Sequence, residues 1–548
     1  MISDKQKTVI IGLDGAPFNI IKEWSQAGIL PNISKLIKEG IFSSLLSSFL
    51  PTSPVAWTTI MSGKNPGKHN VFDWGFRQDN SYRIATVNSR CVRTPLLWNI
   101  LNQNNLSTGV FNVPITYPPS ALNGFMVSGF DAPNTKVGYT YPEDLTAKIK
   151  LHLKDYPLFF RQSYVSGKEN DFIEDIKYVI NKKKEAISFL IDNFEMDFYI
   201  FVLMELDHLH HKMWGCFDSK EKAHYIHEVY KLIDETVGDI INRFPPETNF
   251  FIISDHGAGA LEGVMYINNW LSQLGLLKVK KSPLMSVKNT LERLDLIPKI
   301  YEYCARLGIA KFLRALPSSL QYCAATNFLS FDDVDWSKTK AYSFGEYGQI
   351  YLNLKEREPL GIVHPGKEYD ELVGTIIEAL NKIEDPTSGK KLITKIHRKQ
   401  EIYKGEYLHA APDILFEIKD LSFDSSVKFG FGNKNIIGKQ EFLDSGTHRR
   451  EGILIAVGKN IKKNLLIDIS SILDITPTIL YSMELGIPAD IDGKILKSIF
   501  TDEFIKGNVP YSTLSQEYKK PGVSDKADID SVEQEEIKAR LKSLGYMG

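Results

Sequence analysis

The sequence predicts an α/β protein with a mostly parallel central sheet and helices on both faces. Short runs rich in valine, isoleucine and phenylalanine alternate with longer segments of helical periodicity. Strands buried on both faces appear as continuous apolar runs, and a helix usually connects two parallel strands. At 548 residues, the chain can form one large α/β core with insertions.

The N-terminal elements follow this alternation. Thr8 to Leu13 predicts a buried strand that ends at Asp14-Gly15. A helix should begin at Pro31 and stop at Gly40, because proline suits a first helical turn and glycine a helix end. Residues 171–194 carry apolar side chains at helical spacing, so we expect a long amphipathic helix. Its outer face should carry Lys182-Lys183-Lys184.

Three more elements continue the pattern before residue 255. Phe198 to Met204 predicts a strand, and Tyr225 to Arg243 predicts an amphipathic helix that Pro245-Pro246 ends. Phe250 to Ser254 is again a short apolar run. Strand, helix and strand in this order favour parallel pairing.

The pattern changes near residue 270. Residues 268–320 have helical spacing, and we interpret them as an insertion or cap. Strands are expected at 341–344, 350–354, 414–416 and 452–457, with a helix at 367–383. We therefore predict a catalytic core formed by 1–270 and 326–505, a helical insertion at 271–325, and a C-terminal tail at 506–548 that ends in a short helix.

Composition excludes several classes of function. The net charge is −2, so no strong global field draws the chain to nucleic acid, and no nucleic-acid polymer is expected as a partner. The four cysteines are scattered without a CxxC pair, which argues against a disulfide framework or a thiolate zinc site. The N-terminus lacks signal-peptide features and no apolar run is long enough to span a membrane. We expect a cytoplasmic protein, and the oligomeric state stays open.

Metal-binding residue types follow three of the predicted strands. The first strand ends at Asp14, the second is followed by Asp207-His208-Leu209-His210-His211, and the third by Asp255-His256. A fourth block, Asp444 to Arg450, supplies His448. Ligands gather at the carboxyl ends of strands in open α/β sheets. A lone aspartate after a strand is more often a turn or cap residue, but four such blocks together favour a metal site.

The donor chemistry suggests which metals would bind. Carboxylate and imidazole groups without thiolates suit Zn²⁺, Mn²⁺ or Fe, and there are enough of them for two ions. If 207–211 begins a helix, Asp207 and His211 lie four residues apart and share a face. His208 and His210 then point elsewhere, and we treat them as non-ligands.

The sequence as a whole resembles the type I phosphodiesterase/nucleotide pyrophosphatase branch of the alkaline phosphatase superfamily. The similar segments span nearly the whole chain and are weakest at 270–325. They are IIGLDG, GILPNISKLIKEG, PTSPVAWTTIMSGKNPGKHNVFDW, DHLHHKMW, ISDHGAG, DWSKTKAYSFGEYGQIYLNLKEREPLGIVHPG, APDILF, DSGTHRREG, DISSILDITPTIL, DGKIL and LKSLGY. The resemblance implies an alkaline-phosphatase-like fold and a metal-dependent hydrolase of small phosphoesters. The activity that it implies first is that of a phosphodiesterase/nucleotide pyrophosphatase with two divalent metals, Zn²⁺ before Mn²⁺ or Fe, and a phosphoserine intermediate.

The resemblance also implies roles for particular residues. One metal would be held by Asp14, Asp255, His256 and the nucleophile oxygen, and the other by Asp207, His211 and His448. Counting back from Ser62-Gly63, the nucleophile falls on Ser53, with Thr52 as the alternative if the spacing differs by one residue. Ser53 would attack phosphorus and become phosphorylated.

The sequence departs from the family pattern in one place. Many family members carry an asparagine that contacts the phosphoryl oxygen, and Trp74 occupies the corresponding position. The resemblance therefore does not extend to a nucleotide substrate. A phosphomonoesterase, a phosphonate hydrolase, a phosphotransferase and a non-catalytic binding protein remain alternatives. A sulfatase is not favoured, because Ser53-Pro54-Val55-Ala56-Trp57 lacks the C/S-x-P-x-R pattern.

Overall fold

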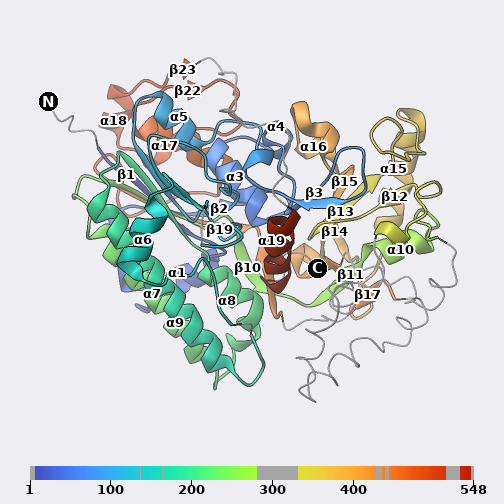
Figure 1. The fold of residues 1–548 in the computed structure, drawn as a ribbon, viewed down its shortest axis with the longest axis horizontal. Coiled ribbons are helices and arrows are strands. Elements are labelled where there is room, and N and C mark those ends of the chain that lie inside the picture. Colours follow the sequence, from blue (N-terminus) through green and yellow to red (C-terminus); the bar gives the residue numbers. More distant parts are fainter. Residues whose placement is uncertain are drawn as a thin grey trace.

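The computed structural model describes residues 6–135, 138–162, 164–280, 331–426, 435–438, 444–513 and 531–544. Its centre is a ten-stranded sheet in the order β20-β2-β19-β9-β1-β8-β5-β6-β7, with β21 also pairing with β2 (Figure 1). The strands are β1 (Thr8–Leu13), β2 (Ile41–Leu46), β5 (Thr108–Phe111), β6 (Gly124–Val127), β7 (Thr140–Tyr141), β8 (Phe198–Leu203), β9 (Asn249–Ile253), β19 (Glu451–Val457), β20 (Leu465–Leu466) and β21 (Ser470–Ser471).

The middle of this sheet is parallel. The strand β1 pairs in parallel with β8 on one side and with β9 on the other, and β8, β5 and β6 continue in the same direction. The strand β19 runs antiparallel to both β9 and β2, and β7 is antiparallel to β6. The predicted α/β class with a mostly parallel sheet is confirmed.

Helices cover both faces of the sheet (Figure 1). One face carries α1 (Phe18–Gln26), α2 (Pro31–Glu39), α9 (Ala223–Ile241) and α7 (Glu169–Asn193). On this face α1 contacts α2, α2 contacts α9, and α9 contacts α7. The other face carries α3 (Ser53–Ser62), α5 (Leu97–Gln103) and α17 (Ile475–Ser482). The helix α6 (Leu145–Leu153) packs beside α7. Within the described residues no helix is long and apolar enough to cross a membrane.

A second, smaller sheet lies to one side, at the right of Figure 1. It is antiparallel, in the order β12 (Ala341–Tyr342), β13 (Gly348–Leu352), β15 (Ile414–Ile418) and β14 (Ile393–Arg398). Together with α10 (Ile267–Gln273) and α15 (Lys367–Leu380) it encloses an apolar cluster of its own. The strands expected at 341–354 and 414–416 exist, but they belong to this sheet and not to the central one.

The helix expected at 171–194 exists as α7, but the lysine run does not lie wholly on its outer face. Lys182 forms an ion pair with Glu185 and Lys184 pairs with Asp239 at the surface, whereas the Lys183 side chain is only 3% exposed. The prediction was wrong for Lys183, because Glu205 supplies a buried partner from a distant segment.

The division of the chain into core, insertion and tail stays a prediction. Most of the expected insertion at 271–325 lies outside the described residues. At the end of the chain, α19 (Ser531–Leu544) is present, and Ile537 and Leu541 are buried against the main core. The Arg540 guanidinium donates to the carbonyl oxygens of Phe130, Ala132 and Pro133, so this helix is packed against the loop that follows β6.

Candidate metal centre

Three ligand blocks meet because the strands that precede them are neighbours. In the order β8-β1-β9 all three strands are parallel, so their carboxyl ends lie at one edge. Asp14 follows β1, and Asp255-His256 follows β9. Asp207 and His211 lie on α8 (Glu205–Met213), which begins just after β8. The helical spacing predicted for this pair is present.

The fourth block reaches the same edge by an antiparallel route. Residues Gly446–Arg449 form a short strand, β18. The strand β18 pairs antiparallel with β10 (Gly257–Ala260), which directly follows His256, and His448 lies opposite Ala258. Because β19 then runs antiparallel to β9, its amino end starts at the edge where β9 finishes.

The first group of ligands contains Asp14, Asp255 and His256, all three completely buried. Nε2 of His256 lies 3.6 Å from Oδ1 of Asp14 and 3.4 Å from Oδ2 of Asp255. Neither of these two carboxylate oxygens accepts a hydrogen bond from the described residues. Buried carboxylate oxygens without a donor are costly unless a cation or proton compensates them.

The second group contains Asp207, His211 and His448, which are also buried. The Nε2 atoms of His211 and His448 are 2.9 Å apart, and Oδ1 of Asp207 lies 3.6 Å and 3.3 Å from them. His256 also comes within reach of Asp207 and His448, and its ring stacks on that of His448 with 3.7 Å between centroids. The two groups are therefore adjacent parts of one centre.

Hydrogen bonds on the far side of two imidazoles orient them as ligands. Nδ1 of His448 faces the carbonyl oxygen of Pro51 at 2.7 Å, and Nδ1 of His256 faces that of Gly257 at 2.9 Å. A carbonyl oxygen only accepts, so each Nδ1 carries the hydrogen and each Nε2 presents its lone pair to the centre. Metal-binding histidines are usually oriented in this way, by a hydrogen bond from the ring nitrogen that does not bind the metal.

The electrostatics of the centre favour a cation. Burial, together with the charges of Asp255 and Asp207, raises the pKa of Asp14 well above its ordinary value. Burial, with the charge of Asp207 added, raises the pKa of Asp255 to about 8. Carboxylates forced together away from water resist ionisation unless a positive charge joins them. The donor set, its geometry and its charge thus fit divalent metal ions.

Ser53 faces the first group. It is the first residue of α3, and its Oγ lies 3.3 Å from Nε2 of His256. Thr52 is the N-cap residue of α3, and its buried Oγ1 has no hydrogen-bond partner among the described residues. The structure therefore brings the Ser53 hydroxyl to the candidate ligands and gives no such contact for Thr52.

Three further residues, Trp57, Gly12 and Gly15, shape the surroundings of Asp14 and Asp255. The Trp57 indole donates a 2.7 Å hydrogen bond to Oδ2 of Asp14. Gly12 makes room for that ring, since a Cβ at residue 12 would collide with it. Gly15 has a left-handed φ of 69°, and its N–H donates to Oδ1 of Asp255. The glycines of IIGLDG were the signal for this close packing.

The histidines interpreted as non-ligands have other partners. The His208 ring stacks on Phe160 with 4.1 Å between centroids. Nε2 of His210 lies 2.8 Å from the hydroxyl of Tyr230 on α9. Both contacts lie away from the candidate ligands, in keeping with the predicted directions of these side chains around α8.

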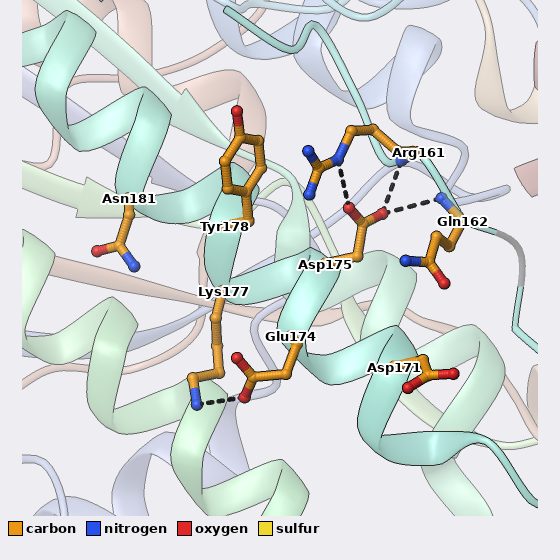
Figure 2. Close-up of a pocket in the computed structure, with 8 residues that line it drawn as sticks. All are labelled: Arg161, Gln162, Asp171, Glu174, Asp175, Lys177, Tyr178 and Asn181. Atoms are coloured by element: carbon orange, nitrogen blue, oxygen red, sulfur yellow. Dashed lines mark hydrogen bonds and ion pairs between the residues drawn. The ribbon is translucent and has the colours of Figure 1, made fainter. Parts of the chain in front are cut away.

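An open pocket of about 410 Å³ lies on α7, remote from these ligands (Figure 2). Two ion pairs lie in its lining, between Arg161 and Asp175 and between Lys177 and Glu174. Asp175 also accepts from the backbone N–H groups of Arg161 and Gln162. The Arg161 guanidinium also lies over the Tyr178 ring at 3.7 Å. None of the candidate metal ligands lines this pocket.

Comparison with known proteins places the chain in a family. The sequence model described as type I phosphodiesterase/nucleotide pyrophosphatase matches residues 8–434. A search of curated proteins found no match. Among solved structures, human ectonucleotide pyrophosphatase/phosphodiesterase 5 is similar over 92% of this chain and 99% of its own, with 11% identity and a TM-score of 0.47. The family match includes every candidate ligand except His448.

Proposed function

Because the chain belongs to the type I phosphodiesterase/nucleotide pyrophosphatase family, it is a phosphoric ester hydrolase, and we propose that it cleaves small phosphodiesters through a phosphoserine intermediate. The observation that carries this proposal is the position of Ser53 Oγ, 3.3 Å from His256 Nε2 and at the start of a helix. A serine hydroxyl next to a bound cation loses its proton more easily and then acts as a nucleophile.

We propose two divalent cations, with Zn²⁺ as the first candidate and Mn²⁺ or Fe as others. Asp14, Asp255, His256 and Ser53 Oγ would hold one, and Asp207, His211 and His448 the other. Bound there, the ions would supply Lewis-acid chemistry that promotes loss of the serine proton and neutralises phosphate charge. The oxygen and nitrogen donors without thiolate support this choice.

The protein's own groups define the course of the reaction. Ser53 Oγ attacks phosphorus and passes its proton to solvent water, the bond from phosphorus to one ester oxygen breaks, and the departing alkoxide takes up a proton from water. The backbone N–H groups of Ser53 and Val55 in the first turn of α3 would be available to the anion, as free donors at helix starts are, whereas Pro54 has no N–H. Water then attacks the phosphoserine, which releases Ser53 and the phosphomonoester. The strand ends hold these groups in place, which lowers the entropic cost of alignment.

A nucleotide is not our preferred substrate. At the position where an asparagine would contact the phosphoryl oxygen, Trp74 is fully buried and packs edge-on against Phe130, with 5.3 Å between the ring centroids. The neighbouring Asp73 accepts hydrogen bonds from the backbone of Glu346 and the side chain of Gln349. Trp74 has no carboxamide and its ring is packed in the core, which supports a substrate other than a nucleotide.

Three basic residues near the family motifs, Lys64, Arg77 and Arg449, are bound by other parts of the protein. Lys64 contacts Thr94 and Asp490, and Arg77 pairs with Glu358. The Arg449 guanidinium donates to the carbonyl oxygens of Leu421 and Ala260. These contacts support a site in which metal ions, rather than side-chain cations, neutralise the substrate.

The proposal is tested with two chromogenic substrates. The Zn²⁺-loaded protein should hydrolyse bis-p-nitrophenyl phosphate faster than p-nitrophenyl phosphate, and acid quenching should trap a phosphorylated Ser53 peptide. Preference for the monoester would favour a phosphomonoesterase instead. Hydrolysis of neither, with metal bound, would favour the non-catalytic alternative.

A further inference from the structure

The helix α8 makes buried polar contacts on faces other than the one that carries Asp207 and His211. Glu205, in its first turn, forms an ion pair with Lys183 of α7 at 2.7 Å, and the two side chains are 0% and 3% exposed. His210 contacts the hydroxyl of Tyr230 on α9 at 2.8 Å. The helix α8, which carries Asp207 and His211, therefore makes polar contacts with both α7 and α9.

Helical geometry explains why these contacts matter. Each residue turns the helix by about 100°, so Glu205 projects roughly opposite to Asp207, two residues later. A rotation of α8 by about 20° would move an atom about 5 to 6 Å from its axis by about 2 Å. Metal–ligand distances tolerate only about 0.2 Å. Small rotations of α8 would therefore remove Asp207 and His211 from any metal.

The contact between Lys183 and Glu205 is a buried ion pair, so it restricts the positions of both side chains. Lys182 and Lys184 pair with Glu185 and Asp239 near the surface, and each side chain remains more than 20% exposed. Lys183 alone of the three points inward. A buried ammonium without its partner is strongly unfavourable, so the pair constrains where Glu205, and with it the start of α8, can lie.

We propose that Lys183 and Tyr230 are positioning residues, which act through Glu205 and His210 to set the rotation of α8 and so the reach of Asp207 and His211. The inference rests on the proposed metal-dependent function. Lys183 thus has a role as the inward lysine of the 182–184 run, and Glu205 and His210 have roles as the residues of α8 through which the two positioning residues act.

The test measures Zn²⁺ affinity of the full chain by calorimetric titration, alongside kcat and KM for bis-p-nitrophenyl phosphate. The variants are Lys183→Met, Lys183→Arg and Tyr230→Phe. Lys184→Met is the matched control, because it removes a neighbouring lysine of the same helix whose partner lies at the surface. Melting temperatures of the metal-free proteins report general stability separately.

Lys183→Met should weaken Zn²⁺ binding by about 10-fold to 100-fold, as loss of the groups that orient metal ligands typically does. It should also lower kcat more than it raises KM. Lys183→Arg should restore affinity to within about threefold, Tyr230→Phe should weaken binding by a smaller factor of about three to ten, and Lys184→Met should resemble the wild type. Lower melting temperatures with unchanged Zn²⁺ affinity in Lys183→Met and Tyr230→Phe would overturn the inference.

Lys183→Met leaves Glu205 buried and unpaired, so it can fail to fold. The double variant Lys183→Met/Glu205→Leu removes both charges and keeps the test decisive: weakened Zn²⁺ binding supports the inference and wild-type affinity overturns it. A wild-type protein that takes up no Zn²⁺ overturns the proposed function as well. Metal uptake and hydrolysis in the wild type, with equal affinity in all variants, overturns the positioning role alone.

Discussion

The indole Nε1–H of Trp57 donates a 2.7 Å hydrogen bond to Oδ2 of Asp14, so the first turns of α3 hold a candidate ligand that follows β1. This contact couples the helix that starts with Ser53 to the first ligand group. Trp57→Phe should weaken Zn²⁺ binding, since Asp14 loses the donor that orients it, and should cost about 1 to 3 kcal/mol of stability.

Titration calorimetry and thermal melting of Trp57→Phe would measure both effects. Trp98→Phe on α5 is the matched control, because Trp98 is also buried but belongs to another part of the core. Equal Zn²⁺ affinity in the two variants would show that the hydrogen bond to Asp14 does not orient the ligand.

Replacement of the hydroxyl residues at the start of α3 should separate the two candidate nucleophiles. Ser53→Ala should lower kcat for bis-p-nitrophenyl phosphate by at least about a thousandfold, because no other oxygen replaces Oγ in the attack. Thr52→Val keeps the shape of the N-cap residue and should retain most activity. A reversed pattern would assign the nucleophile to Thr52.

Loss of a candidate ligand should remove metal and activity while the fold remains. Asp255→Asn and His448→Ala should each lower activity by orders of magnitude and reduce bound metal toward one ion per chain. Elemental analysis, kinetics and circular dichroism together provide the measurement. Wild-type activity in either variant would refute the assigned site.

Metal removal should destabilise the protein. The six candidate Asp and His ligands are buried, so a cation that binds the folded state alone would stabilise it by mass action, by about 2.7 kcal/mol at 100 times its Kd. Chelation with EDTA should therefore lower the melting temperature, and Zn²⁺ should restore it. The Asp255→Asn variant should respond much less, and a full response there would place the metal elsewhere.

The stability of the protein should fall in acid partly because of His69. Burial, with a contribution from Lys64, lowers the pKa of His69 to about 3. Its Nδ1 accepts from the Val71 N–H, so Nε2 carries the hydrogen and faces Thr59 Oγ1 at 3.0 Å. As pH falls from about 6.5 toward 3, the unfolded chain takes up a proton that the folded state refuses, and stability is lost.

For one such proton the slope is at most about 1.4 kcal/mol per pH unit. His69→Gln should be less stable at pH 8, where the wild type keeps the hydrogen bonds, but should lose less stability between pH 6 and pH 4. Urea unfolding at several pH values measures both. Parallel curves for the two proteins would exclude His69 as an acid-sensitive group.

Much of the candidate site could be predicted because local sequence places it. Asp14, Asp207 and Asp255 each follow an apolar strand, and neighbouring parallel strands end at one edge. Asp207 and His211 share a helix face through spacing alone. The roles of Trp57 and Tyr230 could not be predicted, because they depend on contacts between segments far apart in the chain.

The α/β class, the order of the main elements and the residues that follow the strands could all be read from the sequence, because apolar periodicity and strand ends are local properties. The pairing of β18 with β10, which brings His448 opposite Ala258, depends instead on how distant segments fold together. The inward direction of Lys183 also depends on the tertiary structure, whereas Lys182 and Lys184 stay at the surface. A lysine is buried where a distant carboxylate, here Glu205, compensates its charge.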